Sequence, residues 1–282
     1  MKSAQLRIIL IAGTILLSAA LYFAPSQLNK KGAEPKAAAE NTEDEFNPEA
    51  LLRSAKASLD TNALQQLEII EKASAQANNQ DTALLDSIGK IWDKNGIPAA
   101  SAIWFERKAQ IVKSETSYLD AAYRYFDSFR MANDSMIQSL LVGKAITNYQ
   151  KVLELNPNNL NAKTDLGACY ADGTSEPMKG IMLLRDVVAA DPNHEMAQYN
   201  LGMLSVKSGQ LDKAIERFQK VLEINPQRSE MNFYLGQVHL QKGDTAAAIQ
   251  SYETYIKNAK YDVSDVIKMV QALKKKASWK RE

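Results

Sequence analysis

A unit of 34 or 35 residues recurs in the C-terminal half of this chain. Three prolines that each follow an Asn or Asp, namely Pro157, Pro192 and Pro226, stand 35 and then 34 residues apart. A Leu-Gly pair keeps the same interval, at Leu166-Gly167, Leu201-Gly202 and Leu235-Gly236. A period of this length predicts that one supersecondary unit is repeated and stacked. In such an array the repeated residues serve packing, and the exposed faces are available to partners.

Small and bulky residues alternate at fixed places within each unit. Residues 195–228 carry Leu201, Gly202, Ala214, Phe218, Val221 and Pro226 at these places. Residues 229–262 carry Leu235, Gly236, Ala248, Tyr252 and Tyr255, with Lys260 where the proline would stand. Residues 160–193 carry Leu166, Gly167, Tyr170, Gly180, Leu184, Val187 and Pro192, with one extra residue in the turn around Gly173–Pro177. A small residue lets two helices approach, bulky neighbours fill the flanking space, and proline ends the unit.

This pattern resembles the tetratricopeptide repeat (TPR), a helix–turn–helix of 34 residues. The resemblance implies an all-α fold, a right-handed α-solenoid of such repeats over residues 47–262, with its clearest units at 137–260. Earlier units match more loosely: a unit at about 81–114, a first helix at 117–129 that pairs with the helix of Tyr149, and a helical hairpin at 47–78. Residues 263–282 are expected to form a capping helix and a basic tail, because Val263, Val266, Ile267, Val270 and Leu273 make one apolar stripe.

The amino-terminal sequence predicts that the chain is targeted to a membrane. Residues 8–24 are uncharged and mostly apolar behind Lys2 and Arg7, so we expect residues 1–24 to be a signal anchor or transmembrane helix. A cleavable signal peptide, cut after the small residues 18–20, is the alternative. The charges at the start favour a single-pass topology with the body outside the cytoplasm, which is the periplasm in a bacterium. Residues 25–46 lack apolar periodicity and are expected to be a flexible linker.

The composition argues against a nucleic-acid partner, and the absence of known motifs argues against catalysis. The net charge is only +1, which gives no electrostatic footprint for a nucleic-acid partner. Cys169 is the only cysteine, and the chain has no Gly-rich phosphate loop and no His or Cys at metal-ligand spacing. We therefore expect no enzyme activity, no cofactor and no metal.

The candidate site follows from the resemblance, since the first helix of each TPR unit lines the concave face. The predicted partner-binding groove is Met196, Tyr199, Asn200, Met203, Lys207, Phe233, Gln237 and Leu240. The unit before contributes Asn161, Thr164, Ala168, Ala171 and Asp172. An aromatic and thioether patch of Tyr199, Met203 and Phe233 suits a peptide. The alternative is that these side chains only pack against neighbouring helices.

The charged clamp with which some TPR co-chaperones hold carboxylates does not match, since only Asn200 falls on a clamp position. The expected function is a membrane-anchored scaffold, or an accessory subunit of an envelope complex, that binds a protein or peptide in the groove. A soluble exported binding module and a homo-oligomeric structural protein are the alternatives.

Overall fold

The computed structural model describes residues 47–260 and 262–279, and over this part of the chain it contains thirteen α-helices and no strand. The predicted anchor (1–24) and linker (25–46) lie outside the described residues. The helices are α2 (Pro48–Lys56), α3 (Thr61–Gln76), α4 (Thr82–Lys94), α5 (Pro98–Val112), α6 (Glu115–Met131), α7 (Ser135–Leu155), α8 (Leu160–Gly173), α9 (Pro177–Ala190), α10 (Glu195–Lys207), α11 (Leu211–Ile224), α12 (Glu230–Gln241), α13 (Thr245–Asn258) and α14 (Ser264–Trp279).

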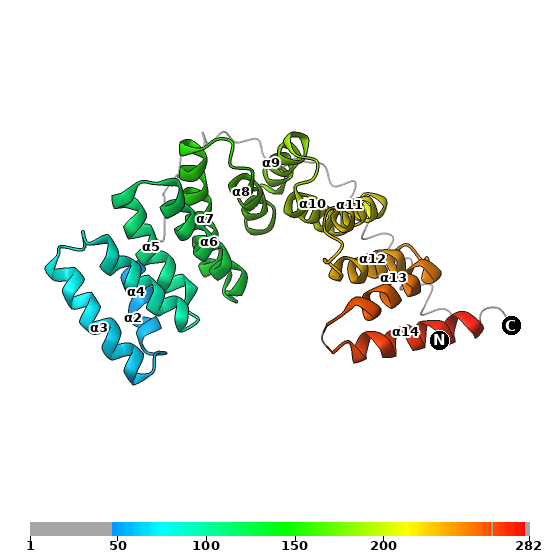
Figure 1. Cartoon of the computed structure of the whole chain (residues 1–282), viewed down its shortest axis with the longest axis horizontal. Helices are drawn as coiled ribbons and strands as arrows, with labels where there is room; N and C mark the ends of the chain where they lie inside the picture. Colours follow the sequence, from blue (N-terminus) through cyan, green and yellow to red (C-terminus); the bar gives the residue numbers. More distant parts are fainter. Residues whose placement is uncertain (1–46, 261, 280–282) are drawn as a thin grey trace, which may run out of the picture. The chain divides into compact units, whose positions relative to one another are not determined.

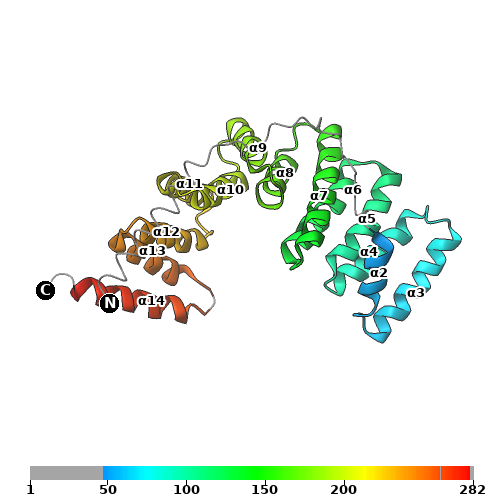
Figure 2. The same cartoon turned by 180° about the vertical axis from the view of Figure 1, so that it is seen from behind.

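From α4 onward the helices pack as successive pairs, α4 with α5, α6 with α7, α8 with α9, α10 with α11 and α12 with α13. Each pair also packs on the next, so the helices follow one another in space in the order of the sequence (Figures 1 and 2). The predicted all-α helical-repeat fold is confirmed. Among the described helices none is long and apolar enough to cross a membrane.

The repeated Asn/Asp-Pro dipeptide ends the second helix of three pairs in the same way. The backbone N–H groups of Asn156, Asp191 and Asn225 each donate to a valine carbonyl four residues back, at 2.8 Å. Each of the three side chains then accepts a hydrogen bond from the backbone N–H two residues on, at 2.9–3.2 Å. The proline between cannot extend the helix, and the Asn or Asp side chain satisfies the turn that follows.

Bulky side chains join one pair to the next. Phe218 and Val221 of α11 pack with Met231 and Leu235 of α12, and all four are buried. One unit earlier, Leu184 and Val187 of α9 pack with Ala197 and Leu201 of α10. At the C-terminal end Val270 of α14 packs on Ala248 and Tyr252, so α14 covers the face that a further repeat would otherwise bury.

The first two helices depart from the hairpin expected over residues 47–78. Helix α3 packs mainly on α4 and α2 mainly on α5, although a Lys56–Glu71 ion pair also links α2 to α3. The nine-residue helix α2 buries only Leu52, and its Glu49 pairs with Arg107 of α5. Because α2 packs mainly on α5 and α3 mainly on α4, the two helices do not form a repeat of their own.

Candidate functional site

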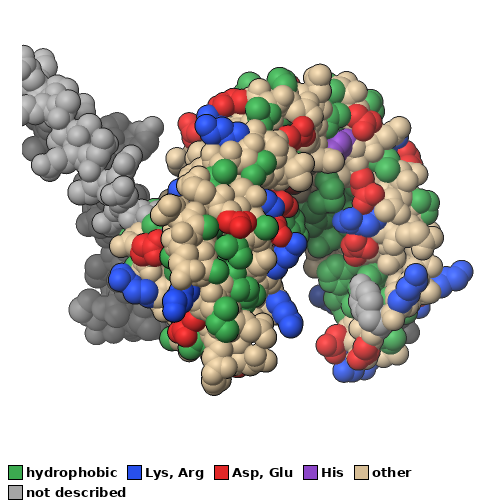
Figure 3. Space-filling view, turned by 60° about the vertical axis from the view of Figure 1, so that its left-hand side comes forward, with side chains coloured by type: hydrophobic (Ala, Val, Ile, Leu, Met, Phe, Trp, Pro, Cys, Tyr) green, Lys and Arg blue, Asp and Glu red, His purple; other side chains and the backbone are tan. Residues whose placement is uncertain are grey.

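A cleft of about 270 Å³ opens on the side of the array formed by first helices. It is lined by one face each of α6, α8 and α10, together with Leu184 of α9. In the space-filling view the inner side of the array is hollowed, with hydrophobic side chains inside and charged ones along the rim (Figure 3). The repeat produces the cleft, because first helices of successive units present equivalent faces to the same side.

Five of the eight predicted groove residues line this cleft, all from α10: Met196, Tyr199, Asn200, Met203 and Lys207. Ala168, Ala171 and Asp172 of the preceding unit face them from α8. Met196 is 41% exposed and Tyr199 is half-buried. The structure thus brings the predicted residues of two units together in one hollow.

The other three predicted residues, Phe233, Gln237 and Leu240 of α12, do not line the cleft. The ring centroid of Phe233 lies 5.6 Å from that of Tyr252 and 5.4 Å from that of Tyr255. Leu240 packs on the same C-terminal cluster, while Gln237 is exposed. For Phe233 and Leu240 the structure gives the packing role that the sequence left open as the alternative.

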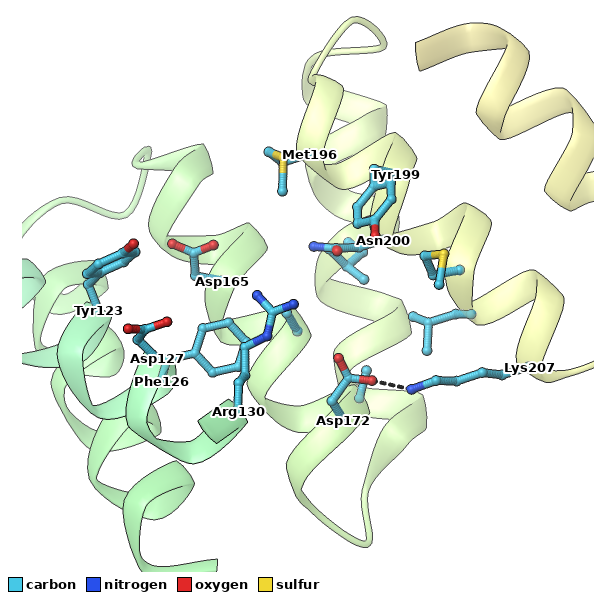
Figure 4. A pocket seen from close by; sticks show the side chains of 15 residues that line it. Tyr123, Phe126, Asp127, Arg130, Asp165, Asp172, Met196, Tyr199, Asn200 and Lys207 are labelled. Carbon is cyan, nitrogen blue, oxygen red and sulfur yellow. Dashed lines mark hydrogen bonds and ion pairs between the residues drawn. The ribbon is translucent and has the colours of Figure 1, made fainter. Parts of the chain in front are cut away.

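Helix α6 supplies four lining residues that the sequence analysis did not select: Tyr123, Phe126, Asp127 and Arg130. Tyr123 is 62% exposed, and the side chain of Arg130 extends into the space between Tyr123 and Tyr199 (Figure 4). A first helix at 117–129 was predicted, but α6 and α7 have 17 and 21 residues, longer than the helices of the later pairs, so the register of the inner face of α6 could not be copied from the repeat. Aligning α6 with the first helices α8 and α10 would have identified these residues as part of the inner face.

The charges of the cleft are only partly neutralised. Lys207 of α10 forms an ion pair with Asp172 of α8, which ties two first helices together across the cleft (Figure 4). Arg130 and Asp127 have no ion-pair partner among the residues that the structure describes. The guanidinium carbon of Arg130 lies 5.8 Å from the centre of the Phe126 ring. A partner can therefore meet both an unneutralised cation and an unneutralised carboxylate here.

Asp165 of α8 is a half-buried carboxylate at the wall of the cleft. Its Oδ2 accepts a hydrogen bond of 3.3 Å from the hydroxyl of Tyr149. Burial raises the pKa of Asp165, and this outweighs the lowering by the Tyr149 bond and by His194. The pKa of the Tyr199 hydroxyl is also raised, to about 12, first by burial and then by the neighbouring Tyr234.

A second hollow continues the cleft toward the N-terminal units. Tyr123 and Asp127 line both hollows, and the second adds Pro98 at the start of α5 and Met131 at the end of α6. Met131 is 61% exposed. The exposed ring of Tyr123 thus stands where the two hollows meet, and a bound segment that ran along the array would cross it.

The described part of the chain shows no arrangement for catalysis around these hollows. Cys169 is buried, and burial raises the pKa of its thiol, so the reactive thiolate is disfavoured. Over the described residues no group of three or more His, Cys, Asp or Glu side chains is placed to hold a metal ion. What the arrangement offers is a surface of aromatic rings, thioethers and unneutralised charges.

These features define the class, an all-α helical-repeat protein with a hollowed face built from first helices. Residues 199–263 match the family model of the tetratricopeptide repeat. That region is therefore similar to the tetratricopeptide repeat, and the array around it has the fold of solved TPR proteins.

Curated relatives match over short segments. The chain is 30% identical to the BBSome complex member BBS4 of Bos taurus over 111 residues, which make up 36% of this chain and 20% of the bovine protein. It is 27% identical to the mitochondrial import receptor subunit TOM70 of Rattus norvegicus over 89 residues, 32% of this chain and 15% of the rat protein. The chain therefore spans a fifth or less of the length of these relatives.

Solved structures agree on the fold. A TPR protein from Parabacteroides merdae is similar with a TM-score of 0.56 and 18% identity, over 82% of this chain and 90% of that one. MamA from Desulfovibrio magneticus is similar with a TM-score of 0.50 and 22% identity, over 63% and 94% of the two chains. The type IV pilus biogenesis factor PilW is similar with a TM-score of 0.52 and 17% identity, over 66% and 80%. At these identities the likeness establishes the fold alone.

Proposed function

We propose that this protein is an interaction scaffold that binds a segment of another protein in the cleft between α6, α8 and α10. The observation that carries the proposal is the cleft itself, where Tyr123 of α6 and Met196, Tyr199 and Met203 of α10 converge. Tyrosine and methionine offer large contact area and adapt to the shape of a bound chain. The unneutralised charge of Arg130 and the carboxylate of Asp165 are available to fix its orientation.

The named relatives are consistent with this role. BBS4 is a member of a complex, and TOM70 is a subunit of a receptor, so both act with other proteins. The matched segments make up a fifth or less of those longer chains, and the partners of those proteins do not transfer to this one. The similarity supports protein binding as the type of function.

We further propose that the scaffold is anchored in a membrane by residues 8–24, with its repeat body outside the cytoplasm as an accessory subunit of an envelope complex. The apolar run at the amino terminus supports the anchor, and the flanking Lys2 and Arg7 support the orientation. Anchoring raises the effective concentration of the cleft near partners in the same membrane, so a weak contact suffices.

In-cell photocrosslinking tests the cleft. A photoreactive residue replaces Tyr123 or Tyr199 in the full-length protein, and crosslinked peptides are identified by mass spectrometry. We expect one partner segment from both positions, and we expect the double variant Tyr199→Ser and Met203→Ser to lose it. Ile69→Ser is the matched control, because Ile69 is 70% exposed on α3, away from the cleft.

Three results would count against parts of this proposal. Crosslinks that return only this chain would indicate a homo-oligomer in place of a scaffold for another protein. A partner retained in the Tyr199/Met203 double variant would place binding elsewhere.

The anchor is tested separately by the mass of the mature protein and by extraction of membranes with alkaline carbonate. Cleavage near Ala20, or release of the protein into the soluble fraction, would favour an exported binding module.

A further inference from the structure

A groove of about 380 Å³ lies between the second helices α9 and α11, with residues of α10 between them. It is separate from the cleft of first helices, with which it shares only Leu204. Met178 and Ile181 of α9 line one side, and Lys213 and Arg217 of α11 line the other. The proposed function makes no use of this surface.

The methionines of α9 are unusually exposed for apolar side chains. Met178 is 62% exposed, and Met182, one helical turn further on, is 63% exposed. The array provides its own comparison, because the buried residues Gly180, Ala214 and Ala248 mark the same position in three successive second helices. Counted from them, Met178 corresponds to Asp212 and Ala246, and Met182 corresponds to Glu216 and Gln250. Among these three second helices only α9 places large apolar side chains at both positions, so the repeat pattern does not require them there.

The charge in this groove is positive and unneutralised. Arg185, Lys213 and Arg217 line it together with one carboxylate, Glu216. None of the four takes part in an ion pair among the residues that the structure describes. Arg217 Nη1 donates to the amide oxygen of Gln198 at 2.6 Å, and Lys213 Nζ to that of Gln210 at 2.7 Å. These neutral acceptors hold the side chains in position and leave their charge available.

We propose that this groove is a second docking surface, and that it takes an acidic amphipathic segment of a partner protein. Apolar side chains of the segment contact Met178 and Ile181 in the groove, and also the exposed Met182 of α9, which does not itself line the groove. Thioethers suit this role because they adapt to an irregular apolar face. Carboxylates beside them pair with Arg185, Lys213 and Arg217 in charge-assisted hydrogen bonds. A helix with apolar residues at i, i+3, i+4 and i+7 and acidic flanks has this chemistry.

The test uses a displayed library of random 16-residue peptides, selected on the full-length chain and counter-selected against the double variant Arg185→Glu and Lys213→Glu. We expect the retained peptides to combine several Asp or Glu residues with apolar residues three and four apart. Their affinity, measured by fluorescence anisotropy, should fall about tenfold or more in the double variant, since reversing two charges replaces attraction by repulsion. It should also fall as NaCl rises, because salt screens exposed charges.

Two controls make the result specific. Lys220→Glu reverses a charge on α11 outside the groove and should change the affinity less than about twofold, since exposed pairs contribute little. Tyr199→Ser, in the cleft, should leave it unchanged, which separates this site from the proposed function. Circular dichroism should show equal helix content in all variants.

The proposal is overturned if the selection yields no peptides, if the peptides are neutral or basic, or if they bind the double variant as well as the wild type. Binding to phosphatidylserine vesicles that the double variant abolishes, without any peptide enriched, would assign the groove to anionic lipid and reject the peptide. Competition by a second copy of this chain alone would likewise reject it.

Discussion

The ring of Phe218 lies against Gly202, sixteen residues earlier in the sequence, so closely that a Cβ on the glycine would stand 2.7 Å from Cε1 of the ring. The same relationship, again sixteen residues apart, joins Gly89 to Phe105 and Gly236 to Tyr252. Between Gly167 and Leu184 the interval is seventeen, since this unit has one extra residue in its turn. The glycine is therefore the point at which the two helices of a unit come into contact.

Gly202→Ala is expected to destabilise the protein by about 1–3 kcal/mol, because Phe218 is completely buried and its ring has no room to move away. Gly143→Ala is the control, since Gly143 lies on the exposed face of α7 and a Cβ there meets nothing within 4 Å. That change should stabilise by about 0.5–1 kcal/mol through helix propensity. Urea unfolding of both variants measures the difference, and equal midpoints would refute the close-contact explanation.

Phe233→Ala should reduce stability without reducing partner binding. The ring packs against Tyr252 and Tyr255 and is only half-buried, so the expected loss is about 2 kcal/mol, below the range for a fully buried phenylalanine. Thermal unfolding gives the stability, and the crosslinking yield from position 199 gives the binding. A variant that stayed as stable as the wild type but lost its crosslink would place Phe233 in the binding surface after all.

Asp165→Asn should stabilise the protein at pH 7. Burial raises the pKa of the Asp165 carboxyl, so the native state binds this proton more tightly than the unfolded chain does. Stability contributed by this group is therefore highest below the usual pKa of 3.8 and falls as the pH rises through the raised value. Asn removes the buried charge and keeps an oxygen that can accept from Tyr149.

The measurement for Asp165 is the free energy of unfolding of both proteins between pH 3.5 and pH 7. The advantage of the Asn variant should be largest at pH 7 and should shrink toward the acidic end. An advantage that was independent of pH would mean that desolvation of the carboxylate is not its cause.

Glu106→Ala is expected to loosen the junction of α5, α6 and α7. One carboxylate, Glu106 of α5, accepts from the hydroxyl of Tyr125 at 2.8 Å and from Asn148 and Lys144 of α7 at 3.2 Å. Removing an acceptor shared by three helices should cost about 2–3 kcal/mol, because these donors are partly withdrawn from water. Hydrogen exchange should speed up in α5 to α7 and remain unchanged in α12 and α13, since a repeat array transmits stability mainly to neighbours. Uniform acceleration along the chain would contradict this.

Sequence reasoning was strongest where each unit repeats the same physical constraints. Leu-Gly pairs, the bulky residue that covers the glycine, and Asn/Asp-Pro stops together predicted the helix pairs from α8 to α13. A separate signal, the apolar stripe at helical spacing after the last repeat, predicted α14 as the cap, and Val270 of that stripe is buried. The sequence was less informative at α2. A helix with a single buried residue shows no repeat pattern, so the sequence does not indicate which helix it packs against.

The candidate site could be predicted only in part. Met196, Tyr199 and Met203 were found because the position of a residue in a clear unit fixes the face on which it lies. Tyr123 and Arg130 were missed because α6 belongs to a loosely matching unit whose two helices, of 17 and 21 residues, are longer than those of the clear repeats. Phe233 was placed in the groove by register alone, but Tyr252 and Tyr255 compete for its ring, and the sequence does not reveal which contact a half-buried aromatic makes.

Helix α10 lies between the cleft and the outer groove, and Leu204 lines both. Leu204 is thus one side chain that a ligand in either hollow can contact, and its rotamer shapes both hollows. If one occupant displaces Leu204, the affinity of the second changes by some factor, and thermodynamic linkage requires the second to change the affinity of the first by that same factor. Because Leu204 is shared, a ligand that displaces its side chain from one hollow would make the two surfaces thermodynamically coupled sites.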